Sequence, residues 1–177
     1  MAGLKFRVLL DSKDKAEVFR DILIRDNDNF ESFYQAILNS YHFENNQMAS
    51  FYMSNDQWDK GHEISLLDMS MGEDPAQILP SVMRTSMMSN YVKEADQKII
   101  LVHDFMRMWI FLIELIGIEE QGPEKPKIVL SVGNAPAEDS KKGNDDSIQF
   151  ETESEISEDE DEFGFDEFES GYDGFDY

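Results

Sequence analysis

Hydrophobic and charged residues alternate along the first segment of the chain, where basic residues separate Leu4, Phe6 and Val8. This period of two is typical of a β-strand with one buried face. Three later segments are nearly continuous runs of β-branched and aromatic residues, which is typical of strands covered on both faces. The pattern predicts strands over residues 4–10, 17–24, 48–53, 61–67, 98–105, 108–116 and 127–132.

Apolar side chains recur at helical spacing from Phe30 to Tyr41, so they line one face of a predicted helix. Asp28 or Asn29 can cap its first turn. A second, shorter helix is predicted over residues 84–92. Strands mixed with a few helices indicate an α+β fold, with an antiparallel sheet of about six or seven strands and two or three packed helices.

The composition changes after Gly133. Residues 134–149 carry few apolar side chains, so burial cannot offset the entropy of ordering them, and we expect a flexible linker there. Residues 150–177 are rich in acidic and aromatic side chains and are predicted to be a disordered tail. The chain therefore divides into a domain over residues 1–133, the linker and the tail.

The net charge of −23 is concentrated at the C-terminal end, because residues 138–177 hold 17 of the 38 acidic residues and two of the 15 basic ones. Negative charge repels phosphate backbones and anionic lipids, which disfavours direct binding to nucleic acids or membranes. A basic protein surface is the electrostatically favoured partner. The oligomeric state is left open by these patterns.

Some residue types and spacings are absent. The chain has no cysteine, which excludes disulfides, thiolate metal sites and cysteine nucleophiles and fits a cytoplasmic protein. Its three histidines stand far apart, so we predict neither a metal site nor a cofactor. The most apolar segment, residues 109–118, is ten residues long, against the roughly 20 that span a bilayer.

The tail combines acidic residues with seven aromatic ones. A long acidic run often serves only to solvate a protein, and this interpretation stays open. Exposed aromatic residues can instead dock into a groove while neighbouring carboxylates attract its basic rim. In that case the anchors would be Phe163, Phe165, Phe168, Tyr172, Phe175 and Tyr177, and the steering residues Asp159, Glu160, Asp161 and Glu162.

The string VHDFMRMW places His103 beside Asp104. Neighbours on a strand point to opposite faces, so these two cannot easily act on one substrate atom. A catalytic base also needs a nucleophile and an orienting partner. We therefore interpret His103 as a half-exposed residue and Asp104 as a turn former at a hairpin. An enzyme site would have to add Trp109 and carboxylates such as Glu63 or Glu114.

The same string resembles a known family. Val102-His103-Asp104-Phe105, then Trp109 and Ile113-Glu114-Leu115, is similar to the hairpin of the plasmid pRiA ORF-three-like family. That hairpin reads tyrosine, aspartate, phenylalanine, ends in tryptophan and leads into an apolar strand with a glutamate. The family is sometimes described as similar to passenger proteins of insertion elements.

The resemblance spans about residues 4–132 and is closest to the short, acidic variants of the family. It implies an α+β domain with helices packed on an antiparallel sheet and no established enzymatic activity. The motif residues, with structural roles, would be Asp104, Phe105, Trp109 and Glu114.

The chain departs from the family at three places. Many members have His-x-His-x-Phe where this chain has Gln47-Met48-Ala49-Ser50-Phe51, and Trp-x-His where it has Trp109-Ile110-Phe111. No metal-binding or acid–base role of those histidines carries over. Met106-Arg107 replaces the Gly-Asp of the family hairpin, so we expect a different type of turn.

The leading hypothesis is a non-enzymatic interaction or regulatory module whose tail engages a basic protein. One alternative is a small enzyme with a site on the sheet around His103 and Asp104. A polar partner for His103 inside a concave pocket would favour that alternative. Another is an acidic DNA mimic, for which salt-sensitive competition with DNA would be the sign.

Overall fold

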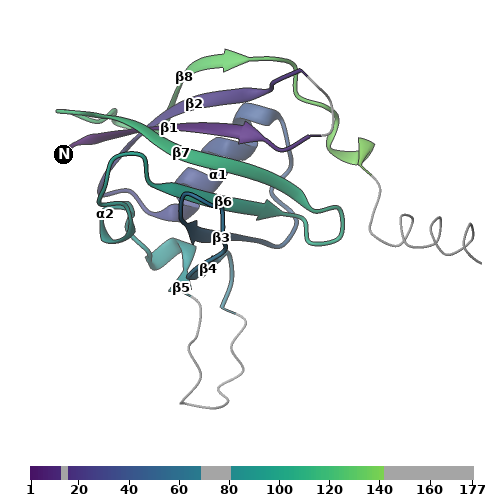
Figure 1. The fold of residues 1–177 in the computed structure, drawn as a ribbon, viewed down its shortest axis with the longest axis horizontal. Helices are drawn as coiled ribbons and strands as arrows, with labels where there is room; N and C mark the ends of the chain where they lie inside the picture. The colour runs from purple at the N-terminus through teal and green to yellow at the C-terminus, as the bar shows by residue number, and fades with distance from the viewer. Residues whose placement is uncertain (13–15, 69–80, 142–177) are drawn as a thin grey trace, which may run out of the picture. The chain divides into compact units, whose positions relative to one another are not determined.

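The strands predicted by alternation form one sheet. The structure is a computed structural model that describes residues 1–12, 16–68 and 81–141. Its strands are β1 (Gly3–Leu10), β2 (Phe19–Arg25), β3 (Ala49–Ser54), β4 (Glu63–Ser65), β5 (Ser81–Val82), β6 (Lys98–His103), β7 (Trp109–Glu119) and β8 (Lys127–Val132). They pair in the order β5-β4-β3-β6-β7-β1-β2-β8 (Figure 1).

β1 lies inside the sheet, antiparallel to β2 on one side and to β7 on the other. Phe6 and Val8 are fully buried, while Lys5 before Phe6 is partly exposed and Arg7 between the two is exposed. The alternation read from the sequence thus separates a buried face from a solvated one.

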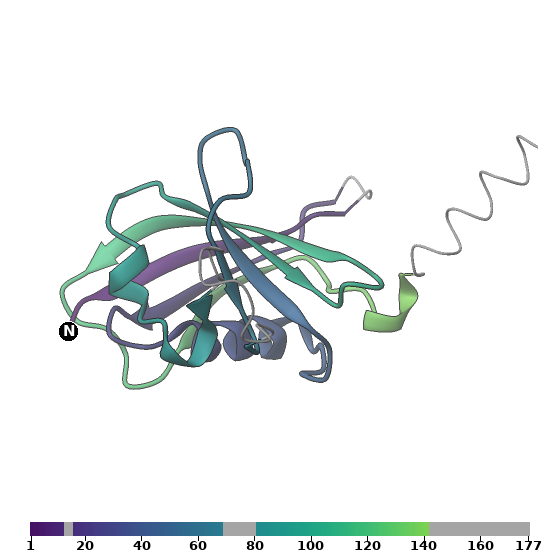
Figure 2. The same cartoon turned by 90° about the horizontal axis from the view of Figure 1, so that it is seen from below.

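The predicted long helix is α1 (Phe30–Tyr41), which covers one face of the sheet (Figure 2). Asn29 is the residue that caps it, because its side-chain oxygen accepts a hydrogen bond from the Ser32 backbone N–H at 2.9 Å. On its buried side, Phe33 stacks on Phe51 of β3 with ring centroids 5.6 Å apart. Aromatic packing between helix and sheet therefore forms the centre of the core.

The fold class is α+β, as the pattern of strands and helices predicts. The sheet has eight strands because the two-residue β5 joins it, pairing in parallel with β4; the other strand pairs described are antiparallel.

The segment expected to be one helix over residues 84–92 is instead η1 (Met83–Thr85) and α2 (Met88–Tyr91). They are separated because Ser86 and Met87 are extended, and the Ser86 carbonyl accepts the Phe30 amide at 2.9 Å.

The body continues beyond the expected boundary at Gly133, and its compact unit runs from Met1 to Lys141. Residues 134–141, which composition assigns to the flexible linker, pack Ala135 against the core and form η2 (Glu138–Ser140). Polar side chains in this segment bond to buried groups, an interaction that composition does not reveal. The rest of the linker and the predicted disordered tail, residues 142–177, lie outside the described residues.

Arg20 is a buried cation that joins three elements. Its Nε donates to the carbonyl of Ser40 near the end of α1 at 3.0 Å. Its Nη1 donates to the carbonyls of Val132 and Gly133 at 3.0 and 3.2 Å, and its guanidinium lies over the ring of Tyr41. One side chain of β2 therefore satisfies carbonyls at the ends of α1 and β8.

β8 is an edge strand with exposed apolar side chains at Ile128, Val129 and Leu130. Its register with β2 shifts between Asp21 and Ile22, which marks a β-bulge. A bulge twists an edge and opposes the addition of another strand.

Among the helices described, none is long and apolar enough to cross a membrane.

Replacing Phe33 by alanine should lower the free energy of unfolding by about 3–5 kcal/mol, because the cavity would lie between Phe6 and Phe51. Urea unfolding measures the change. Gln35→Ala, at an exposed position of the same helix, is the matched control and should change stability little. Equal losses for the two variants would contradict this packing.

Candidate functional site at the end of the β6–β7 hairpin

Asp104 makes the turn between β6 and β7. It adopts a left-handed conformation with φ of 68°, which aspartate tolerates better than most residues. Its Oδ1 accepts hydrogen bonds from the backbone amides of Met106 and Arg107 at 3.1 and 3.2 Å. The other left-handed position of this hairpin is Met108. Met106 is not among the left-handed residues, so the turn requires no glycine at this position.

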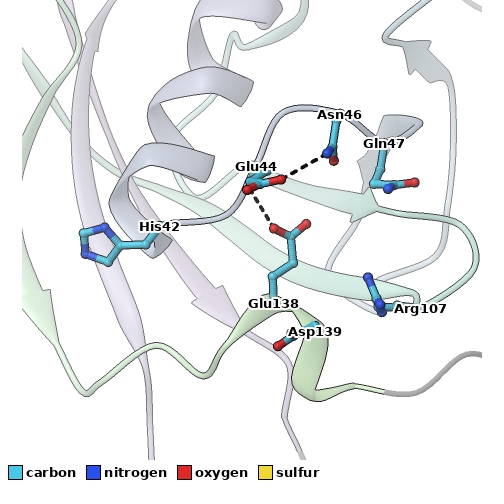
Figure 3. A pocket seen from close by; sticks show the side chains of 7 residues that line it. All are labelled: His42, Glu44, Asn46, Gln47, Arg107, Glu138 and Asp139. Carbon is cyan, nitrogen blue, oxygen red and sulfur yellow. Dashed lines mark hydrogen bonds between the residues drawn. The ribbon is translucent and has the colours of Figure 1, made fainter.

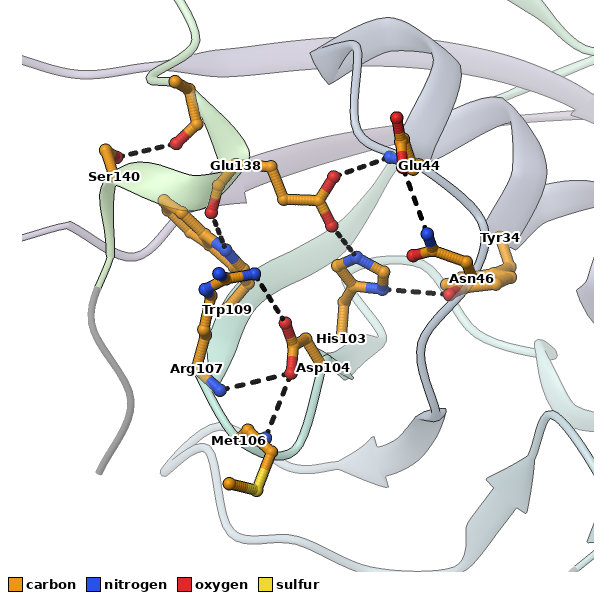
Figure 4. Close-up of polar contacts among 11 residues, drawn as sticks. Tyr34, Glu44, Asn46, His103, Asp104, Met106, Arg107, Trp109, Glu138 and Ser140 are labelled. Carbon is orange, nitrogen blue, oxygen red and sulfur yellow. Dashed lines mark hydrogen bonds and ion pairs between the residues drawn. The ribbon is translucent and has the colours of Figure 1, made fainter. Parts of the chain in front are cut away.

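His103 is fully buried, so the expectation of a half-exposed side chain is wrong. Tyr34 from α1 and Glu138 from η2 enclose it from two sides (Figure 4). The Tyr34 hydroxyl lies 2.9 Å from Nδ1, and Oε2 of Glu138 lies 2.8 Å from Nε2. An ionised carboxylate can only accept, so Nε2 carries the hydrogen and Nδ1 of a neutral ring accepts from the phenol.

Tyr34 keeps its proton over a wide pH range. Burial raises the pKa of its phenol, and the negative charges of Glu138 and Asp104 raise this pKa further. The phenol therefore stays a hydrogen-bond donor to His103, and the chain from Tyr34 through His103 to Glu138 has one consistent direction of donation.

Glu138 is the centre of these contacts, which we call the Glu138 latch: Tyr34, His103, Trp109, Glu138 and the backbone amide of Glu44. Oε1 of Glu138 accepts from that amide at 2.7 Å. The Glu138 carbonyl accepts from the indole Nε1 of Trp109 at 3.1 Å. The latch holds the segment after β8 against the hairpin and leaves Trp109 only 4% exposed.

Lys141 closes the same segment onto the hairpin. Its ammonium donates to the carbonyl of Met108 and lies over the ring of Trp109, 5.3 Å from the centroid. The indole of Trp109 thus packs beside a cation and donates to a carbonyl.

A cavity of about 290 Å³ opens beside the latch (Figure 3). We call it the latch pocket. It is lined by His42, Glu44, Asn46 and Gln47 after α1, Arg107 from the hairpin, and Glu138 and Asp139 from η2. Three carboxylates face one guanidinium, which itself pairs with Asp104 at 3.5 Å. The pocket therefore carries an excess of negative charge.

His103 is poorly placed for catalysis, although it has two polar partners. Both of its ring nitrogens are bonded to protein groups, and its side chain does not line the latch pocket. A general base needs a free lone pair within reach of the substrate proton. The ring instead stabilises the docked segment.

The two carboxylates of the enzyme hypothesis, Glu63 and Glu114, do not join His103. The strand register places Glu63 and Glu114 on the opposite face of the sheet. Glu63 accepts from the hydroxyl of Ser50 at 2.6 Å, and Glu114 pairs with Lys98 at 3.7 Å. Within the described part of the chain, His, Asp and Glu residues form no group of three or more suited to a metal ion.

The remaining residues predicted from the sequence belong either to the hairpin or to the tail. Phe105 is exposed on the turn, whereas Trp109 is buried in the latch. The predicted tail residues lie outside the described residues: Phe163, Phe165, Phe168, Tyr172, Phe175, Tyr177, Asp159, Glu160, Asp161 and Glu162.

Sequence reasoning missed Tyr34 and Glu138 as members of the site. Tyr34 was recognised only as part of the apolar helix face, and its hydroxyl gave no separate signal. Glu138 stands in a polar segment without periodicity, so no pattern distinguished it from the neighbouring Asp139.

Comparison with known proteins identifies the fold but no activity. The model of the plasmid pRiA4b ORF-3-like protein family matches residues 2–174. The crystal structure of MM3350, a protein of unknown function from Methanosarcina mazei Go1, superposes with a TM-score of 0.66 and 20% identity, covering 89% of this chain and 86% of that one. Such identity shows a shared fold alone. Among curated proteins, none matches the sequence.

Glu138→Ala should lower the free energy of unfolding by about 1–3 kcal/mol, because it leaves the buried Nε2–H of His103 and the Glu44 amide without an acceptor. The emission of Trp109 should also shift to the red as its cover loosens. Asp139→Ala, at the exposed neighbouring position, should change neither property. Identical behaviour of the two variants would contradict the latch.

Alkaline pH should destabilise the body partly through Tyr34. Its pKa is raised in the folded state, so above the ordinary phenol pKa of about 10 the unfolded chain loses a proton that the folded chain retains. Stability is therefore full below that pH and falls as pH rises beyond it. Tyr34→Phe should show a shallower fall, measured as urea midpoints against pH. An unchanged slope would show that the phenol ionises freely.

Proposed function

Since the chain belongs to the plasmid pRiA4b ORF-3-like family, whose description gives no activity, we propose its function from its own side chains: it is a non-enzymatic interaction module that binds a basic protein surface. The negative latch pocket is the observation that carries this proposal. A cationic side chain of a partner would meet Glu44, Glu138 and Asp139 there, while the charge of Arg107 is already offset by Asp104.

The chain after Lys141 extends the same charge sign. Residues 142–177 contain 15 of the 38 acidic residues and one basic residue. Asp159, Glu160, Asp161 and Glu162 would steer a basic partner toward the protein. The aromatic anchors Phe163, Phe165, Phe168, Tyr172, Phe175 and Tyr177 would then occupy a groove on it.

The enzyme hypothesis has less support, because both nitrogens of His103 are engaged within the protein. We propose a cytoplasmic location for the interaction, which the cysteine-free sequence fits.

Affinity capture from native cytosol tests the proposed function. Full chain, a chain ending at Lys141 and the Glu44→Gln/Asp139→Asn variant would be compared at low and moderate salt. The shortened chain ends at Lys141 rather than Gly133 so that the Glu138 latch is kept. Glu44 and Asp139 lose charge without losing latch contacts, since Glu44 uses its backbone amide there.

We expect basic proteins to bind the full chain in a salt-sensitive way, and to bind both altered chains less. Replacing the six aromatic anchors by serine, with every charge kept, should weaken binding further if they dock. Capture that is the same for all chains and at both salt concentrations would reject the proposal. Captured proteins that DNA displaces would instead indicate a DNA mimic.

A further inference from the structure

The face of the sheet opposite α1 carries a second, smaller cavity. The register of β1 with β2 and β7 places Leu9 beside Phe19 and Leu112, and Arg7 beside Glu114. All of these point away from the helix, because Phe6 and Val8 of the same strand are buried on the other side. Figure 2 shows the β3–β4 connection rising from this open face.

Trp58 lies in that connection and has a left-handed backbone, with φ of 61°. Such a conformation is costly for a bulky residue and persists only when its surroundings impose it. Here Asn55 imposes it: its Oδ1 accepts from the amides of Gln57 and Asp59 at 3.0 and 3.1 Å. The Trp58 amide donates to the Asn55 carbonyl at 3.0 Å. These bonds hold the backbone of the loop at Trp58, whose side chain lines the cavity.

The cavity between this indole and the strands has a volume of about 150 Å³, and we call it the Trp58 groove. Its apolar walls are Leu9, Phe19, Leu112 and Trp58. This volume is below the roughly 300–1,000 Å³ of pockets that hold small-molecule ligands. The cavity is instead about the size of one long side chain. Its volume corresponds to that of some five water molecules at about 30 Å³ each.

The polar residues of the groove carry excess negative charge. Arg7 is neutralised by Asp21, to which its Nε and Nη2 donate at 2.9 Å each, and this pairing raises the pKa of the guanidinium. Glu17 and Glu114 also line the groove. Lys98 pairs with both Glu114 and Asp56 at 3.7 Å, and its ammonium lies over the ring of Trp58, 5.7 Å from the centroid. In and around the groove, four carboxylates therefore outnumber the two cations of Arg7 and Lys98: those of Glu17, Asp21, Asp56 and Glu114.

We propose that the Trp58 groove binds one arginine side chain presented by a basic protein. Its methylene stem would pack on Leu9 and Leu112. Its guanidinium would take the place of the Lys98 ammonium over the indole and reach Glu17 or Glu114. The open face of the sheet already contains an arginine that stacks on an aromatic ring and pairs with a carboxylate. The guanidinium of Arg7 lies 4.4 Å from the ring centroid of Phe19 and pairs with Asp21. The proposal rests on the proposed function only for the source of the arginine.

Nuclear magnetic resonance of the full chain tests the groove directly. The chain has two tryptophans, so two indole N–H signals report on Trp58 and on the buried Trp109. The probe is N-acetyl-arginine amide, and the matched neutral probe is N-acetyl-citrulline amide. Arginine should shift the Trp58 signal in a saturable way, whereas citrulline should bind about fivefold more weakly or not at all.

Variants identify the groups that bind the probe. Glu17→Gln/Glu114→Gln should weaken the response by about tenfold through loss of the charge-assisted contacts. Glu44→Gln/Asp139→Asn removes the same amount of charge from the latch pocket and should leave the response unchanged. The groove proposal is overturned by any of three results: no saturable shift, an equal response to citrulline, or equal weakening by the two double variants.

These results separate the groove from the proposed function. A Trp58 response to arginine, combined with no salt-sensitive capture of basic proteins, would keep the groove and reject the function. Capture of basic proteins together with a silent Trp58 signal would keep the function and reject the groove.

Discussion

The hydrogen bond between His103 and Glu138 joins two parts of the body that the chain connects only through β7 and β8. A buried imidazole and a mostly buried carboxylate are costly unless each finds a partner, and here they satisfy one another at 2.8 Å. The polar groups of the β6–β7 hairpin are therefore satisfied only when the segment after β8 lies against it. His103 and Trp109 thus use their ring nitrogens to hold these parts of the structure together.

The two cavities share one electrostatic character on different surfaces. In both, an arginine that could have made the cavity positive is paired with an aspartate, Arg107 with Asp104 and Arg7 with Asp21. The remaining carboxylates then set the local sign of charge. The two cavities of the body thus carry an excess of negative charge, as the whole chain does. The C-terminal residues of the chain, 142–177, carry a further excess.

The sequence predicted those features that depend on period. Alternation located β1, and helical spacing located α1 to the residue, because burial of one face is a local constraint. The burial of His103 could not be predicted in this way. Its partners stand 69 and 35 residues away, and one of them lies in a segment whose polar composition indicates a linker. Contacts of that kind depend on tertiary geometry, which leaves no trace in hydrophobic periodicity.

Arg20 gives the exposed edge of the sheet a cooperative link to the core. If β8 alone detached, the guanidinium would lose two carbonyl acceptors while still enclosed beside Tyr41 and Ser40. Leaving a buried charge without its acceptors is more costly than exposing a few more apolar atoms. Local fraying of this edge is therefore coupled to the α1 end through one side chain, which raises the free energy of opening the edge.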